Sequence, residues 1–82
     1  MLTIWENDQN ECVFTLNDSG FEDSTTQELA RELIKEHFWR DDFVLYKESV
    51  FRQMRKDNPD SWGKYLRLNE MSLIGGQFWM EY

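Results

Sequence analysis

The chain has 82 residues, 16 of them acidic and nine basic, and a formal net charge of −7. A chain of this length forms one domain, so we treat residues 1–82 as a single domain. The negative charge disfavours direct binding of nucleic acid, and no segment approaches the roughly 20 apolar residues that cross a membrane.

Two short β-rich segments near the N-terminus, LTIWE (residues 2–6) and ECVFTL (residues 11–16), flank the turn-forming residues NDQN. Together they predict a hairpin. The single cysteine, Cys12, is expected to be a small buried hydrophobe. Because one cysteine cannot form an internal disulfide, and because the N-terminus lacks a signal-peptide pattern, we expect a soluble protein of the cytoplasm.

The segment NDSG (17–20) is expected to break the chain before a helix. Ser24 with Gln27, or Thr25 with Glu28, fits a capping box at the helix start. The segment TTQELARELIKEHFW then places its apolar side chains on one face at about 100° per residue. These are Leu29, Ala30, Leu33, Ile34, His37 and Phe38. The pattern predicts one long amphipathic helix.

The middle of the chain fits two interpretations. FVLYKE (43–48) and VFRQMR (50–55) favour two strands, because aromatic and β-branched residues suit a pleated surface. The spacing of Phe43, Tyr46, Val50 and Met54 also fits one face of a helix. We prefer the strands. DNPDSWG, which contains the only proline, is expected to be a loop.

The C-terminal part predicts further strands. KYLRL (64–68) alternates as a strand does. Gly75 and Gly76 are expected to interrupt the chain between two elements. QFWMEY (77–82) is then expected to be a last strand that closes the sheet beside the first strand. The predicted fold class is α+β: a small antiparallel sheet, made of the N-terminal hairpin and C-terminal strands, with one long amphipathic helix packed on it.

Few residues are available for catalysis or metal binding. His37 is expected to be a packed histidine; it makes only half of a metal site with Asp41, and no local motif supports a catalytic pair with Cys12. The loop that starts at Asn58 has Asn69 where a calcium loop needs a glutamate. The Gly75–Gly76 pair fits no phosphate-binding pattern. We therefore expect no enzyme, no metal and no cofactor.

One basic patch alternates with aromatic and apolar side chains, as in proteins that hold single-stranded nucleic acid. It comprises Arg52, Arg55, Lys56, Lys64 and Arg67 with Phe51, Met54, Trp62 and Tyr65. The net charge of the protein opposes that function, and the bases are expected to pair with acids of the same half.

The acidic residues concentrate at the start of the chain. Residues 1–32 hold eight carboxylates and one base, whereas residues 33–82 are neutral overall. Carboxylates two apart on a strand, as for Glu6 and Asp8, lie about 6.7 Å apart; those four apart on a helix have Cβ atoms about 5–6 Å apart. Both spacings are similar to that of neighbouring phosphates. Such a surface either mimics nucleic acid or is simply solvated.

The length, the acidity and the element order, which ends in an aromatic strand after glycine (GGQFWMEY), resemble small phage-encoded anti-defence proteins, including type I anti-CRISPR inhibitors. The resemblance covers the whole chain as a pattern, and it transfers no residue's role. It implies an inhibitor in the host-cell cytoplasm that binds a basic, nucleic-acid-handling surface of a host defence complex without catalysis.

The leading hypothesis is therefore a non-enzymatic binding protein that acts through its acidic first half. Trp5 and Phe21 are the predicted apolar anchors, because anchors supply affinity while charges set rate and specificity. The predicted partner-binding carboxylates are Glu6, Asp8, Glu11, Glu22, Asp23, Glu28 and Glu32. The alternative is a small structural protein that forms a homodimer or larger assembly through acidic and basic faces and exposed aromatic residues.

Overall fold

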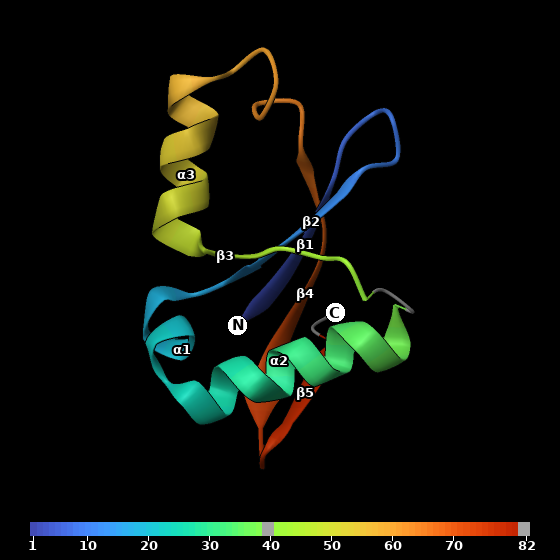
Figure 1. Ribbon diagram of the computed structural model, residues 1–82, viewed down its shortest axis with the longest axis vertical. Helices are drawn as coiled ribbons and strands as arrows, with labels where there is room; N and C mark the ends of the chain where they lie inside the picture. Colours follow the sequence, from blue (N-terminus) through green and yellow to red (C-terminus); the bar gives the residue numbers. More distant parts are fainter. Residues whose placement is uncertain (39–40, 81–82) are drawn as a thin grey trace.

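The structure is a computed structural model that describes residues 1–38 and 41–80, for Met80 the backbone alone. Within these residues one sheet of five strands lies against three helices (Figure 1). The elements are β1 (Leu2–Glu6), β2 (Cys12–Leu16), α1 (Asp18–Glu22), α2 (Ser24–His37), β3 (Leu45–Lys47), α3 (Glu48–Asp57), β4 (Leu66–Ile74) and β5 (Gln77–Met80). The α+β class and the N-terminal hairpin agree with the sequence prediction.

The sheet is mixed, with strand order β3-β2-β1-β4-β5. β1 pairs antiparallel with β2 and β4, and β4 with β5, but β2 and β3 run parallel. Parallel neighbours need a long crossover connection. Here α1 and α2 supply it, because the chain leaves β2, builds both helices and returns in β3. The expectation of a purely antiparallel sheet is therefore wrong.

One face of the sheet is covered by α2, in the segment where the sequence predicts a helix. Alternate residues of β1 and β2 pack with Ala30 and Ile34 of this helix, because successive strand residues point to opposite faces. His37, expected on the packed face, is exposed. The helix ends there, and the next residue, Phe38, instead packs on Phe14 with ring centroids 5.5 Å apart.

The opposite face is covered by α3 and by a group of aromatic rings. Phe51 is the fully buried side chain of α3, and its ring centroid lies 5.2 Å from that of Trp5 on β1. Val13 and Tyr65 are buried beside it. Tyr46 and Trp62 pack around this second core and complete it.

The preference for a strand at residues 50–55 is wrong, because α3 occupies them. Phe51, Met54 and Arg55 turn toward the sheet at helical spacing, while Val50, which the alternative helical pattern placed on the apolar face, is exposed. Polar pairs four residues apart stabilise the helix. They are Glu48 with Arg52 and Gln53 with Asp57, each at 2.9 Å.

The segment NDSG does not break the chain but begins the short helix α1. Asp18 ties α1 to the start of α3, since its Oδ1 accepts a hydrogen bond from the backbone N of Ser49 at 3.0 Å. That bond lowers the pKa of Asp18 below its usual value. Gly20 lies in a closely packed place, where a Cβ would lie 2.7 Å from Oδ1 of Asn17 and would force this side chain to shift.

The last strand lies at the edge of the sheet and not beside the first strand as expected. Gly75 and Gly76 have φ values of +58° and +82°, and Ile74 pairs directly with Gln77. This is a two-residue hairpin turn of the kind that needs left-handed residues. It folds β5 straight back onto β4, so β4 takes the place beside β1.

The ends of two predicted elements, Trp39 and residues 81–82, lie outside the described residues. No helix in the described ranges is long and apolar enough to cross a membrane.

We expect Phe51→Ala to lower the free energy of unfolding by about 3–5 kcal/mol, a large share of the roughly 5–15 kcal/mol that holds a small domain folded. The phenyl ring is 2% exposed and joins the second core. Urea denaturation followed by tryptophan fluorescence measures the loss. Val50→Ala, on the outer side of α3 and 47% exposed, is the matched control, with an expected change of about 0.5 kcal/mol. Equal losses would show that Phe51 does not hold α3 on the sheet.

Candidate partner-binding pocket

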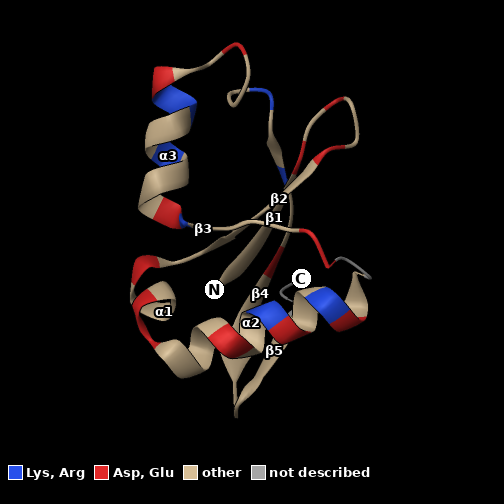
Figure 2. Ribbon diagram, viewed as in Figure 1, with Lys and Arg blue, Asp and Glu red and all other residues tan. Residues whose placement is uncertain are grey.

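The predicted partner-binding carboxylates lie in two groups at different ends of the molecule (Figure 2). The first group is the hairpin set Glu6, Asp8 and Glu11, and the second is the helix set Glu22, Asp23, Glu28 and Glu32. In Figure 2 the hairpin tip stands at the upper right and α2 at the bottom. Asp8 lies in the turn after β1, so the strand spacing expected between Glu6 and Asp8 does not apply.

Two carboxylates at the junction of α1 and α2 have partners within the fold. Glu22 accepts a hydrogen bond from Lys47 Nζ at 2.6 Å, which raises the pKa of Lys47. Asp23 caps α2: it accepts from the backbone N of Thr25 at 3.3 Å and from Oγ1 of Thr26 at 2.7 Å. The cap is therefore Asp23 and not the predicted Ser24 or Thr25. Such caps contribute about 0.5–2 kcal/mol.

The carboxylates of Glu28 and Glu32 are exposed on α2 and form no ion pair within the described residues. With Glu36 they make a row of carboxylates four residues apart along the helix. Arg31 and Lys35 lie beside this row, and Figure 2 shows both signs of charge along α2. The negative charge of the helix is therefore partly compensated.

The two predicted anchors are half-buried by internal contacts. Trp5 packs on Phe51, and its Nε1 donates a hydrogen bond to Oγ1 of Thr15 at 2.9 Å. Phe21 packs against the core beneath α2. Neither ring is free to present its whole face, and their contact with a partner stays a prediction.

Asn7 organises the tip of the β1–β2 hairpin. Its Oδ1 accepts hydrogen bonds from the backbone N of Gln9 at 3.0 Å and of Glu11 at 2.9 Å. Its Nδ2 donates to Oε1 of Glu11 at 3.0 Å. Asn10 takes a φ of 62°, which asparagine tolerates better than most residues. The Glu11 carboxylate is therefore held in place by the turn itself.

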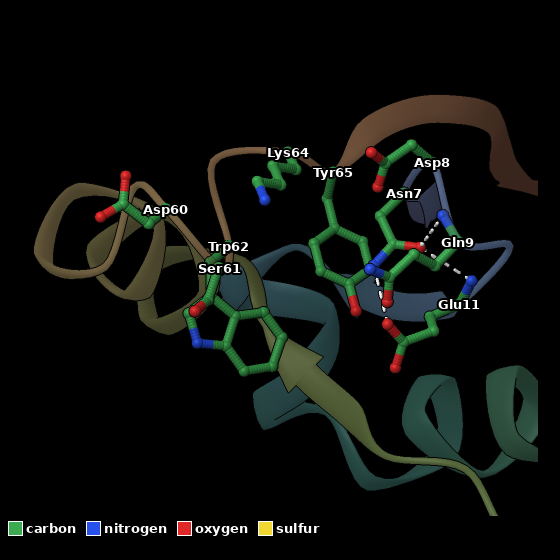
Figure 3. Close-up of a pocket in the computed structure, with 9 residues that line it drawn as sticks. All are labelled: Asn7, Asp8, Gln9, Glu11, Asp60, Ser61, Trp62, Lys64 and Tyr65. Atoms are coloured by element: carbon green, nitrogen blue, oxygen red, sulfur yellow. Dashed lines mark hydrogen bonds between the residues drawn. The ribbon is translucent and has the colours of Figure 1, made fainter.

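A pocket of about 330 Å³ lies between this tip and the loop that joins α3 to β4 (Figure 3). Trp62 and Tyr65 form an aromatic wall, stacked with ring centroids 5.5 Å apart and planes at 22°. Figure 3 shows the Tyr65 hydroxyl turned toward Glu11. The charged lining residues are Asp8, Glu11, Asp60 and Lys64. Three carboxylates and one ammonium give the pocket a formal charge of −2.

The phenol of Tyr65 is kept protonated by its surroundings. Burial raises the pKa of Tyr65 above the ordinary 10.0, and the negative charge of Glu11 raises this pKa further. A protonated phenol donates a hydrogen bond. The pocket therefore has a neutral aromatic wall beside its carboxylates over the whole physiological pH range.

Aromatic faces and carboxylates together are groups that hold organic cations. A cation within about 6 Å of a ring centroid is attracted to the face of the ring, and a carboxylate forms strong charge-assisted hydrogen bonds with guanidinium or ammonium. The pocket volume is at the lower end of the roughly 300–1,000 Å³ typical of ligand sites. The pocket therefore suits the end of one lysine or arginine side chain.

Sequence reasoning included Asp8 and Glu11 in the site but missed Asp60, Trp62 and Tyr65. It assigned these three residues to a failed calcium loop or to the basic patch, because nothing local links them to the hairpin. Their one sequence signal is the pair of aromatic residues within the loop segment DSWGKY.

The two residues considered for catalysis, His37 and Cys12, do not form a site together in the described structure. His37 is exposed at the end of α2, and Cys12 is half-buried against the core beneath α2. Across residues 1–38 and 41–80, no group of three or more histidine, cysteine, aspartate or glutamate side chains is arranged to hold a metal ion.

Comparisons with known proteins yield no relative. No family model matches the sequence, and no curated protein or solved structure is significantly similar to the chain. The functional argument therefore rests on the geometry of the chain.

We expect the stability of the protein to fall as the pH rises above 10.0, because Tyr65 has a raised pKa in the folded state. The folded state keeps this proton while the unfolded state releases it, so the contribution is complete below the unfolded pKa and is lost as pH passes through the folded pKa. Tyr65→Phe removes this part of the pH dependence. Urea denaturation of both proteins at neutral and alkaline pH measures it, and equal alkaline losses would exclude Tyr65 as the group responsible.

Proposed function

We propose that this protein is a non-enzymatic binding protein that takes a basic side chain of a partner into the pocket at the hairpin tip. The observation that supports the proposal is the stacked pair Trp62 and Tyr65 beside three carboxylates. The rings offer an apolar, cation-attracting wall, and Glu11 is held in position by Asn7 before any partner arrives. Preorganised groups of this kind lose little entropy on binding.

The remaining acidic residues serve the rate of encounter. A protein of charge −7 attracts a basic surface and accelerates association by about 10- to 1,000-fold. This attraction acts over a Debye length of about 8 Å at physiological salt. Exposed carboxylates such as Glu28 and Glu32 contribute to it without needing a defined contact. The pocket supplies the specificity.

The partner class we propose is a host protein with a basic nucleic-acid-binding surface, as the resemblance to phage anti-defence inhibitors implies. Such a surface presents closely spaced lysine and arginine side chains. One of them enters the pocket, while the exposed carboxylates on α2, at a spacing similar to that of phosphates, attract the others at longer range. The protein then competes with nucleic acid for this surface, in the manner of a nucleic-acid mimic.

We expect the double variant Asp8→Lys and Asp60→Lys to weaken partner binding by more than about tenfold, the loss of one good ionic contact. Both side chains are exposed and line the pocket. Competition between the protein and a labelled oligonucleotide for candidate nucleic-acid-binding proteins measures the affinity.

The matched control is Glu28→Lys with Glu32→Lys, which changes the net charge equally at the other end of the molecule. We expect this control to slow association and to leave the dissociation rate nearly unchanged. Equal losses of affinity in both variants would show that the pocket contributes only its charge and no specific contact. A loss in the α2 variant alone would move the site to α2.

A second candidate function, self-association, is favoured by the outer edge of the sheet. β5 is an edge strand whose four residues include no charge. Trp79 is 55% exposed and Ile74 beside the turn is 62% exposed. Uncharged, apolar edge strands favour pairing with another chain. Two copies joined through β5 would form one continuous sheet.

We expect Trp79→Lys to abolish any such dimer. Light scattering at low and high salt measures the molar mass. An edge-to-edge dimer strengthens with salt, because two chains of charge −7 repel, whereas association of acidic with basic faces weakens. A strict monomer at high micromolar concentration at both low and high salt would exclude self-association.

A further inference from the structure

Three arginines surround a second hollow, of about 230 Å³, on the α3 side of the sheet. Arg52 and Arg55 come from α3 and Arg67 from β4, while Thr3 and Trp5 of β1 lie between them. These three residues belong to the basic patch that the sequence predicts. The fold brings them together from positions up to fifteen residues apart.

Two of these arginines each have a carboxylate partner. Arg52 Nη2 lies 2.9 Å from Oε1 of Glu48, and Arg67 Nη1 lies 2.6 Å from Oε1 of Glu70. Exposed pairs of this kind are weak. Each contact also uses only one of the five N–H groups of a guanidinium, so both arginines keep donors for another ligand.

The third arginine, Arg55, has no carboxylate partner among the described residues. Its guanidinium carbon lies 4.8 Å from the ring centroid of Trp5 and 5.9 Å from that of Phe51. Nη2 donates to the backbone O of Tyr65 at 3.1 Å. Nε is buried and has no hydrogen-bond partner in the described part of the chain.

This arrangement leaves a positive charge without compensation. An arginine side chain stays protonated in proteins, so it cannot lose its charge as a buried lysine does. A partly buried charge without a counter-ion is unfavourable unless a ligand supplies one. The rings of Trp5 and Phe51 and the backbone carbonyl of Tyr65 fix the position of the guanidinium group. A ligand would therefore meet a guanidinium that is already in place.

We propose that this hollow binds a small oxyanion, the phosphate or carboxylate group of a small molecule. Three guanidinium groups and the carboxylates of Glu48 and Glu70 give the lining a formal charge of +1, in a protein whose net charge is −7. Planar guanidinium groups match the oxygens of phosphate and carboxylate in pairs. The volume holds such a group with a short apolar extension against Trp5.

A strand of nucleic acid fits the hollow less well than a small anion. Strand-binding proteins offer exposed rings on which bases stack. Of the rings in the predicted patch, Phe51 borders this hollow but is buried in the second core, whereas Trp62 and Tyr65 line the pocket at the hairpin tip. The arginines therefore stand without a stacking platform.

The test is an NMR titration of the nitrogen-labelled full chain with inorganic phosphate and, separately, with acetate, at an ionic strength held constant with chloride. The reporters are the indole N–H of Trp5 and the Nε–H of Arg55. We expect a saturable shift of both signals. Tighter binding of phosphate would identify a phosphate group as the ligand, and tighter binding of acetate would identify a carboxylate.

We expect Arg55→Met, which keeps the apolar stem, to weaken anion binding by more than about tenfold. Lys56→Met is the matched control: it removes the same charge from the next residue of α3, which does not line the hollow, and should bind as the wild type does. Arg55→Lys keeps a charge without the planar fork and should lie between the two, which provides a test should the methionine variant fold poorly. The absence of a saturable shift in the wild type, or equal binding by Arg55→Met and Lys56→Met, would overturn the proposal.

Discussion

The structure depends on burying both faces of the central strand β1. Leu2 and Ile4 lie under α2, whereas Thr3 and Trp5 point to the opposite face, toward α3. α3 has ten residues and one fully buried side chain, so it cannot cover the second face alone. Rings from outside the helix, those of Trp62 and Tyr65 among them, complete the cover. Both hollows open at the margins of this short helix, where the cover ends.

The two hollows have lining residues of opposite net charge, but they are connected through one hydrogen bond. Arg55, which lines the basic hollow, donates its hydrogen bond to the backbone of Tyr65, whose ring walls the acidic pocket. Substitution of Arg55 therefore also removes a hydrogen bond to the segment that carries Tyr65. Other residues lie apart from this connection. In the acidic pocket these are Asp8 and Asp60, and at the basic hollow they are the ion-paired Arg67 and Glu70. Variants at these positions separate the two sites, because each of these residues lines only one of the two hollows.

The elements that were predictable from sequence are those whose signals are local. The hairpin at residues 2–16 and the helix at Ser24–His37 follow from alternation, turn residues and a 3.6-residue period within each segment. The Gly75–Gly76 turn also had a local signal, since two glycines between apolar segments favour a tight hairpin. Because the pair was interpreted only as a break between elements, the last strand was predicted to lie beside β1, whereas it lies beside β4. α3 was harder, because its segment VFRQMR also contains the β-branched and aromatic residues that suit a strand, so the strand was preferred to the helical alternative.

The candidate sites were beyond sequence reasoning for a different reason: charge segregated along a chain is not segregated in space. The acidic first 32 residues run through a hairpin and then two helices, which carry their carboxylates to opposite ends of the molecule (Figure 2). The neutral remainder of the chain, residues 33–82, then brings its charged side chains to different places in different numbers. It brings both Asp60 and Lys64 to the hairpin tip, where their formal charges cancel, and it brings Lys47 to Glu22, which partly neutralises the second acidic group. The same neutral remainder gathers three arginines around Trp5. The sign of each site is therefore set by which loops and helices meet there, and only the fold determines those meetings.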